Sequence, residues 1–375
     1  MTFARRVFAY DGLRVLVEAG DSRHLEWLEE FLTPAFDVVA DVAADVRVTV
    51  VEDTARFESL RDAGPSPDGR EIEVFALDRQ AIRLPHWRQA GPGTTVFDDR
   101  FGAFYEATPD RRHITILARA GEIAPRTSMM RIVRETVMNH TYRRGNLFLH
   151  AAGCAVDGRG VVVAGPSKAG KTTLLLQLLR QPGARYLAND RIRVRMAPAA
   201  PELRGMPTIV TLRQGTVGMF PELAARLATR PYHHRLRIAE VAVLPPEPAP
   251  SWRDGRIGVS PAQFCDAAGV SAIAEAPATA LLFPRITGEP GDTIVRPLPP
   301  SVAAAQLAGA LFGVRSWKKT SDLFSLPDDD AAPSRDALMA LCSQFAEVVP
   351  CFECRLGNEA YAAPMTGAVL EEVLG

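Results

Sequence analysis

A glycine-rich loop followed by Lys-Thr carries the clearest chemical signal in the sequence. Residues 161–180 read VVVAGPSKAGKTTLLLQLLR, and residues 165–172 match the pattern G-x-x-x-x-G-K-[ST]. In this pattern the glycines let backbone N–H groups turn toward phosphates, the lysine reaches the β- and γ-phosphate oxygens, and the last hydroxyl ligates Mg²⁺. The loop therefore predicts a site for ATP and Mg²⁺, against the alternative of an ordinary strand-to-helix turn. The residues expected to contact the nucleotide are Gly165, Pro166, Ser167, Lys168, Ala169, Gly170, Lys171, Thr172 and Thr173.

The segments on either side of the loop have the character that a phosphate site requires. The apolar run before it predicts a strand, and the Leu-rich run after it predicts a helix that stops at Gln181-Pro182-Gly183. The positive N-terminal end of that helix would face the phosphates. Lys168 stands where many such loops have a second glycine, so we expect it to take ordinary backbone angles or to extend into solvent.

The strand that enters the loop is predicted to belong to a hairpin. Residues 147–156 and 161–164 are two apolar runs around the Gly-containing turn DGRG. After the helix, residues 184–190 (ARYLAND) and 191–197 (RIRVRMA) are strand-like, and they place Asp190 18 residues beyond Thr172.

This arrangement resembles the catalytic core of HPr kinase/phosphorylase and its relatives, whose P-loop fold is shared with ATP-dependent PEP carboxykinase. The resemblance is carried by His150-Ala151, by the loop 165–172 and by Ala188-Asn189-Asp190. In addition, Glu202–Pro207 (ELRGMP) is similar to the family's EIRG signature, whose glutamate helps to hold the metal. The sequence departs from the family in having Asn189 where the first aspartate of a pair is usual, and its ELRG stretch lies closer to Asp190 than in HPr kinase itself.

The resemblance assigns roles to several side chains. Asp190 is the candidate general base for an acceptor hydroxyl, with Mg²⁺ binding or turn capping as alternatives. His150 would lie by the acceptor and orient that carboxylate, although a lone histidine is often simply a partly buried residue. Arg204 and Arg285 could neutralise charge on the transferred phosphoryl group. The catalytic candidates are thus Asp190, His150, Lys171 and Arg204, and the metal candidates are Thr172, Asp190 and Glu202.

Other polar residues have simpler interpretations. Arg191, Arg193 and Arg195 alternate along one strand and are expected to form a solvated outer face. His233-His234 is expected to line a loop. Cys351 and Cys354 form a CxxC on a predicted strand, where side chains three apart point to opposite faces, so we interpret them as structural thiols. These three groups of polar residues are at positions 191–195, 233–234 and 351–354.

The chain is predicted to contain two domains in an α/β fold. Residues 1–125 are rich in short strand signals with one helical stretch at 23–32, and predict a small α+β module of antiparallel strands. Residues 126–375 predict a mixed α/β catalytic domain of the PEP carboxykinase/HPr kinase type. It would begin with a helix over 127–144, capped by Gly145.

Composition argues against several classes of protein. Lys+Arg is 43 and Asp+Glu is 44, so the chain is not expected to coat nucleic acid or an anionic membrane. There is no run of 18 apolar residues, and the N-terminal residues lack the apolar core of a signal peptide. Five cysteines in 375 residues are ordinary for a reducing compartment, so a cytoplasmic location is expected.

Together these patterns predict an ATP-dependent kinase that phosphorylates a Ser or Thr hydroxyl of a protein or peptide, for example in a peptide natural-product pathway. The first module could bind an extended peptide by strand addition. Two alternatives stay open: a kinase of a small hydroxylated metabolite or free amino acid, and a regulatory nucleotide-binding module without transfer activity. The oligomeric state also stays open, since HPr kinase itself forms hexamers.

Overall fold

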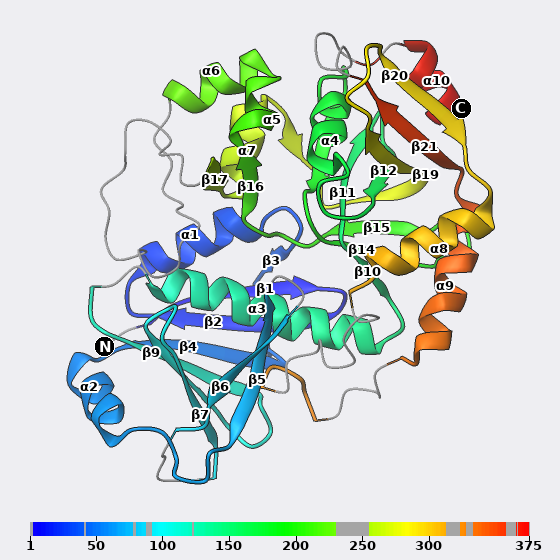
Figure 1. The fold of residues 1–375 in the computed structure, drawn as a ribbon. Coiled ribbons are helices and arrows are strands. Elements are labelled where there is room, and N and C mark those ends of the chain that lie inside the picture. The colour runs from blue at the N-terminus through cyan, green and yellow to red at the C-terminus, as the bar shows by residue number, and fades with distance from the viewer. Residues whose placement is uncertain are drawn as a thin grey trace. The chain divides into compact units, whose positions relative to one another are not determined.

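The computed structural model describes residues 3–40, 43–77, 80–87, 92–121, 124–229, 255–312, 323–327, 333–357, 365 and 367–374. It is a mixed α/β protein with several sheets, and it divides into two compact units (Figure 1). The first unit contains Met1–Arg144 together with the described residues 323–327. The second contains the other described residues from Gly145 onward.

The first unit is built on a seven-stranded sheet in the order β3-β1-β2-β4-β9-β8-β7. The prediction of antiparallel strands is wrong at its centre, where β2 pairs with β4 and β4 with β9 in parallel. Parallel neighbours need a crossover connection, which the helices of this unit provide. A separate hairpin joins β5 (Glu71–Leu77) and β6 (Gln80–Pro85). The sheet strands are β1 (Ala4–Tyr10), β2 (Leu13–Ala19), β3 (Asp37–Val39), β4 (Val46–Glu52), β7 (Thr94–Asp98), β8 (Ala103–Ala107) and β9 (His113–Ala118).

Two helices of the first unit form the crossovers. The expected helix is α1 (Ser22–Leu32), which lies between β2 and β4 in the chain. The unexpected one is α2 (Thr54–Ala63), which lies between β4 and β9. Phe57 is the buried side chain of α2 and packs with Trp87 and Phe104. With so narrow an apolar face, α2 gives little helical periodicity in the sequence.

The helix predicted over 127–144 is α3 (Ala124–Arg143), and Gly145 follows it with a φ of +79°. The sequence-based boundary placed this helix in the second domain, but it belongs to the first unit. Its side chains explain why: the Ser128 hydroxyl lies 3.1 Å from the Tyr105 hydroxyl, and the Arg131 guanidinium lies 4.7 Å from the centroid of the Phe101 ring. The change of unit therefore comes after α3 and not before it.

The second unit contains a ten-stranded sheet with the main order β10-β14-β15-β19-β12-β11-β13-β18, and β20 and β21 continue from β19. A two-stranded sheet pairs β16 (Val210–Arg213) with β17 (Arg256–Val259). The main strands are β10 (Leu147–Leu149), β11 (Ala151–Val156), β12 (Arg159–Ala164), β13 (Ala184–Ala188), β14 (Ile192–Arg195), β15 (Glu202–Gly205), β18 (Ser271–Ala272), β19 (Glu275–Ile286), β20 (Thr293–Pro297) and β21 (Cys351–Leu356). The helices are α4 (Lys171–Leu179), α5 (Gln214–Gly218), α6 (Pro221–Thr229), α7 (Pro261–Ala268), α8 (Pro300–Ala310), α9 (Arg335–Val348) and α10 (Gly367–Leu374).

The core of the second unit forms where α4 packs against β11 and β12 (Figure 1). Leu174, Leu175 and Leu178 are fully buried there, against valines such as Val161 and Val163. Close packing continues at Gly205 of β15, where an added Cβ would overlap the carbonyl oxygen of Leu187. The apolar helix α4, which follows the loop 165–172, is therefore packed firmly against the sheet.

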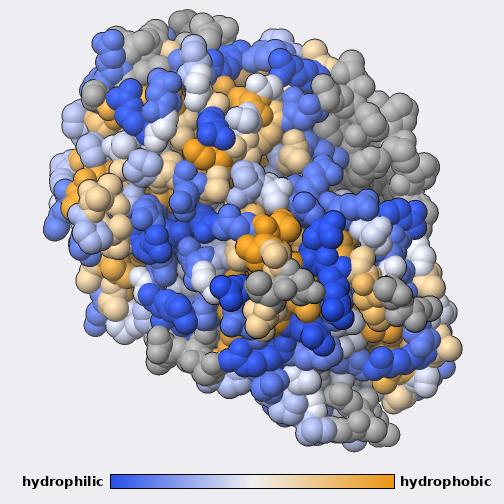
Figure 2. Space-filling model, turned by 180° about the vertical axis from the view of Figure 1, so that it is seen from behind, coloured by the Kyte–Doolittle hydropathy of each residue, from blue (hydrophilic) through white to orange (hydrophobic). Residues whose placement is uncertain are grey.

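Among the described residues, no helix is both long and apolar enough to cross a membrane. Figure 2 shows a face on which hydrophilic residues predominate and hydrophobic residues form small patches. Five large hydrophobic side chains are exposed among the described residues. They are Val38, Ile286, Ile294, Val302 and Val348.

Candidate functional site

One edge of the second unit's sheet gathers most of the predicted site residues. β11 runs antiparallel to both β12 and β13, so the start of β11 meets the ends of the other two strands. His150 precedes β11, Gly165 follows β12, and Asn189 and Asp190 follow β13. The backbone N–H of Ala151 also donates to the carbonyl oxygen of Asp190 at 3.1 Å. Residues from three separate parts of the chain are therefore neighbours at this edge.

The hairpin that leads into the loop is confirmed. β11 and β12 are joined by Asp157 and Gly158, whose φ angles are +49° and +79°. Two successive positive φ angles are typical of the tight turn that matches the twist of antiparallel strands.

The loop between β12 and α4 has a backbone that suits glycine at both ends. Gly165 has a φ of +151° and Gly170 a φ of +108°, and a Cβ on Gly170 would lie 2.9 Å from Cγ1 of Ile286. Lys168 is exposed and has a φ of +69°. It thus extends into solvent as expected, but from a left-handed backbone that side chains other than glycine rarely adopt.

Lys171 is the first residue of α4 and is buried. Its Nζ donates to the carbonyl oxygens of Gly165 at 2.8 Å and Pro166 at 3.1 Å. Gly170 is the N-cap of this helix, and no side chain in the described structure donates or accepts a capping hydrogen bond there. The ammonium group is therefore held by carbonyl oxygens at the start of the loop, and it belongs to the first residue of a helix whose N-terminus carries partial positive charge.

The other loop residues differ in how far they reach solvent. Pro166 and Ser167 are exposed, and Ala169 is half-buried. Thr172 is half-buried in the first turn of α4, where its hydroxyl could reach a ligand. Thr173 is buried, with 3% of its surface exposed.

His150 and Asp190 form a hydrogen-bonded pair at the centre of this edge. The imidazole Nε2 lies 3.0 Å from Oδ1 of Asp190, and the two side chains are 25% and 36% exposed. Burial opposes ionisation of Asp190, but the hydrogen bond and charge of His150, with the charges of Arg191 and Lys171, lower its pKa to about 2. Asp190 is therefore a carboxylate throughout the neutral pH range.

The three alternating arginines do not form a solvated face, and that expectation is wrong. Arg193 is fully buried and Arg191 is buried beside Asp190, whereas Arg195 is exposed. Nε of Arg191 lies 3.7 Å from Oδ2 of Asp190, and its guanidinium lies 4.8 Å from the centroid of the Phe312 ring. Alternation in the sequence places the three on one face of the strand but does not reveal whether that face is covered.

Glu202 does not join Asp190. Its carboxylate pairs with Arg195 and lies 3.9 Å from Nη1 of Arg193. In the register of β14 and β15 it is opposite Arg195, at the end of Ile192–Arg195 that is remote from Asp190. A four-residue strand spans about 10 Å, so one metal ion could not bind both carboxylates. The predicted metal set of Thr172, Asp190 and Glu202 is thus not brought together.

The two candidate phosphate-binding arginines occupy different places. Arg204 is buried on β15, directly opposite Arg193 in the register. Arg285 is exposed near the end of β19, which runs parallel to β12. A Cβ added to Gly165 would lie 3.9 Å from Cδ of Pro284, the residue that precedes Arg285. Arg285 is thus beside the loop. Arg204 is on β15, which runs toward the Asp190 end of β14: Gly205 lies opposite Ile192, and the N–H of Met206 donates to the carbonyl oxygen of Arg191 at 3.0 Å.

Asn189 holds the backbone in place beside Asp190. Its Oδ1 accepts hydrogen bonds from the Tyr186 hydroxyl at 2.8 Å and the Thr208 hydroxyl at 3.3 Å. An amide can accept these bonds without adding a second negative charge to the site. Asn189 stands where HPr kinase-like proteins usually have the first aspartate of a pair. Asp190 is therefore the one carboxylate of residues 189–190.

The remaining candidates do not form a metal centre. In the part of the chain that the structure describes, no group of three His, Cys, Asp or Glu could hold a metal ion. Cys351 and Cys354 are buried free thiols, and burial raises their pKa to about 11 and about 12. Such thiols are inert, as expected of structural residues. His233-His234 lies outside the described residues.

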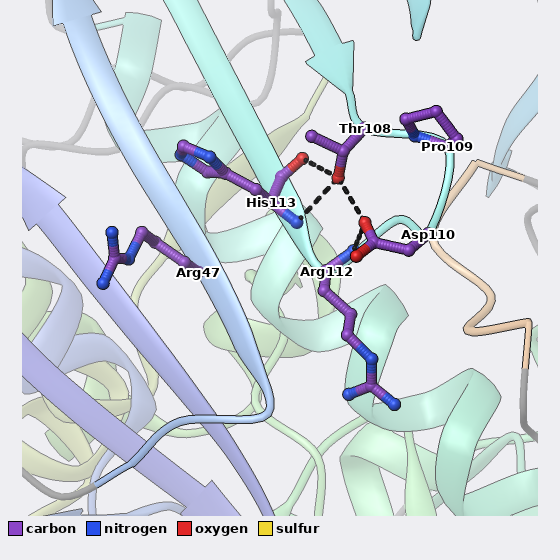
Figure 3. Close-up of a pocket in the computed structure, with 6 residues that line it drawn as sticks. All are labelled: Arg47, Thr108, Pro109, Asp110, Arg112 and His113. Atoms are coloured by element: carbon purple, nitrogen blue, oxygen red, sulfur yellow. Dashed lines mark hydrogen bonds between the residues drawn. The ribbon is translucent and has the colours of Figure 1, made fainter. Parts of the chain in front are cut away.

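A depression of about 570 Å³ lies on the first unit, and Figure 3 shows its lining. The Asp110 carboxylate accepts bonds from the Thr108 hydroxyl at 2.6 Å and the Arg112 N–H at 3.1 Å. The Asp110 carboxylate is thus already hydrogen-bonded within its own turn. None of the predicted site residues lines the depression. The lining residues are Arg47, Thr108, Pro109, Asp110, Arg112 and His113.

The sequence was also compared with known proteins. No protein-family model matches the chain, and a search of curated proteins found no significant match. The interpretation of the site therefore depends on its own residues and geometry.

Proposed function

We propose that this chain is an ATP-dependent kinase that transfers the γ-phosphoryl group to a Ser or Thr hydroxyl of a protein or peptide. The observation that carries the proposal is the placement of a phosphate-type loop beside the His150–Asp190 pair at one sheet edge. Phosphoryl transfer requires mainly positioning and charge stabilisation, with a carboxylate near the acceptor hydroxyl. The loop and the pair offer both.

Features of the loop favour a bound triphosphate. Gly165 and Gly170 have positive φ angles, as the glycines of phosphate-binding loops often do, and the N-terminus of α4 has no side-chain cap within the described structure. The Lys171 ammonium is held by two carbonyl oxygens that phosphate oxygens could replace. Residues 165–173 would therefore hold the triphosphate, and Thr172 would offer a hydroxyl to Mg²⁺. Bound ATP with Mg²⁺ supplies the phosphoryl group and neutralises part of its charge.

Asp190 would accept the hydrogen bond of the acceptor hydroxyl. Because its pKa is about 2, it is a weak base. We expect it to orient the hydroxyl and to take the proton late, when the oxygen already bonds to phosphorus and has become more acidic. His150 fixes one carboxylate oxygen and leaves the other toward Arg191. Because His150 holds one oxygen of the Asp190 carboxylate, we assign the role of base to Asp190 and the role of positioning residue to His150.

The finer fold assignment belongs to the same proposal. We infer that the second unit has the PEP carboxykinase/HPr kinase-like fold, because its phosphate-type loop follows a hairpin strand, with a histidine at the start of the partner strand. The first unit would then bind the acceptor, and a sheet with the edge strand β3 offers one means of doing so. Glu202 is left out of the metal site because arginines neutralise it.

The test is incubation with γ-labelled ATP, Mg²⁺ and candidate acceptors encoded beside the gene, with intact-mass detection of a phosphoryl group. Wild type should modify one acceptor, and the Asp190→Asn variant should not do so at a comparable rate. Nucleotide binding without transfer to any acceptor would favour a regulatory module, and transfer to a free amino acid or metabolite would favour the small-molecule alternative. Absence of nucleotide binding would refute the proposal as a whole.

A further inference from the structure

The chain returns to the His150–Asp190 pair at the end of α8. The backbone N–H of His150 donates to the carbonyl oxygen of Ala310 at 2.7 Å, and that of Phe312 donates to Phe148 at 2.9 Å. Leu149 and Leu311 form an antiparallel bridge between these bonds. A single β-bridge at the end of α8 therefore joins the chain to the segment that carries His150.

This bridge brings the Phe312 ring to His150 and Arg191, the two neighbours of the Asp190 carboxylate. The Arg191 guanidinium lies 4.8 Å from the ring centroid, and the His150 ring meets it edge-on, with centroids 6.0 Å apart at 60°. His150 approaches Oδ1 of Asp190 and Arg191 approaches Oδ2. One aromatic side chain therefore contacts the groups on both sides of the carboxylate.

We propose that Phe312 is a positioning residue that holds His150 and Arg191 on the two oxygens of the Asp190 carboxylate. An aromatic face attracts a guanidinium, and a ring edge packs well against a second ring, so both contacts restrict side-chain rotation. The restriction leaves Asp190 with one orientation toward an acceptor. The effect of Phe312 on turnover depends on the proposed kinase function, but its effect on the His150–Asp190 hydrogen bond does not.

The test follows the ring N–H protons of His150 by NMR in histidine-labelled protein, with His150→Gln to assign the signal. In wild type the hydrogen-bonded Nε2 proton should be protected from exchange with water. The Phe312→Ala variant should lose that protection, and Phe312→Tyr, which keeps the ring, should retain it. Phe312→Leu keeps apolar volume without a ring and should also lose it, which provides a second variant if the alanine variant does not fold.

Phe220→Leu provides a control for Phe312→Leu, because the Phe220 ring lies under a different guanidinium, that of Arg180, at 4.9 Å, and leucine keeps most of the buried apolar volume. This variant should leave the His150 signal unchanged. In kinase assays, Phe312→Ala and Phe312→Leu should lower kcat by about 10- to 100-fold with an unchanged KM for ATP, and Phe312→Tyr should restore the rate. A protected His150 proton in both Phe312→Ala and Phe312→Leu would overturn the proposal. Absence of phosphoryl transfer in wild type would refute the kinase function and leave the NMR result to decide the role of Phe312.

Discussion

The imidazole Nε2 of His150 lies 3.0 Å from Oδ1 of Asp190, although His150 precedes β11 and Asp190 follows β13, on either side of the loop and α4 in the chain. The pair keeps the pKa of the carboxylate low, at the same edge of the sheet where the loop 165–172 begins. An enzyme that transfers a phosphoryl group would depend on this pair, whereas a protein that only binds a nucleotide would not.

Replacement of Asp190 by Asn should lower kcat by about 10²–10⁴-fold, because the amide keeps the shape but cannot accept a proton. ATP affinity should change little, because the loop and Lys171 carry the phosphate contacts. Measurement of kcat and ATP affinity across a Mg²⁺ titration separates the roles: rescue by added Mg²⁺ would indicate a metal ligand. Glu202→Gln serves as the control and should leave the Mg²⁺ dependence unchanged, since its carboxylate pairs with Arg195.

Replacement of Lys171 by Ala should remove most ATP binding, because the ammonium that would face the β- and γ-phosphates is lost. Calorimetric titration with ATP and Mg²⁺ measures the effect. Equal affinities in wild type and variant would contradict the assignment of the loop.

Lys168→Gly, a change within the same loop, should preserve ATP affinity to within a few-fold, because the Lys168 side chain extends into solvent. It should also raise the free energy of unfolding by about 0.5 kcal/mol, since relief of a left-handed backbone outweighs the added freedom of the unfolded chain. Urea unfolding checks this value. A marked loss of ATP binding would instead assign Lys168 to the phosphate site.

The His150–Asp190 pair should make the second unit sensitive to acid. The pKa of Asp190 falls from an ordinary 3.8 to about 2 on folding, so its contribution to stability is complete above about pH 4 and is lost as the pH falls through about 2. Asp190→Asn should therefore lose less stability than wild type over this range. Urea unfolding at a series of pH values provides the comparison, and identical pH dependences would show that the pair does not contribute.

Gly205→Ala should destabilise the protein by about 1–3 kcal/mol, because the new methyl group would overlap the carbonyl oxygen of Leu187 on the strand that leads to Asp190. Gly215→Ala is the control: no atom lies within 4 Å of its added Cβ, and alanine in a helix adds about 0.5–1 kcal/mol of stability. Thermal unfolding of both variants measures the difference. Equal effects would mean that β15 can move away from β13.

The sequence by itself determined the features that depend on contiguous residues. The loop 165–172, the hairpin before it and the helix after it follow from local backbone preferences and apolar periodicity, and all of them are present in the structure. The alternation of Arg191, Arg193 and Arg195 likewise determines that they share a face, because side chains alternate along any strand.

Only the tertiary structure decided that the arginine-bearing face of β14 is largely covered and which strands run parallel. It also decided that the Asp190 carboxylate is separated from that of Glu202. Burial of Arg191 and Arg193, pairing of Glu202 with Arg195 and the contact of Phe312 with His150 all join residues from different elements. Such contacts depend on how strands are ordered and aligned, and that order results from the packing of the whole apolar core rather than from any local pattern.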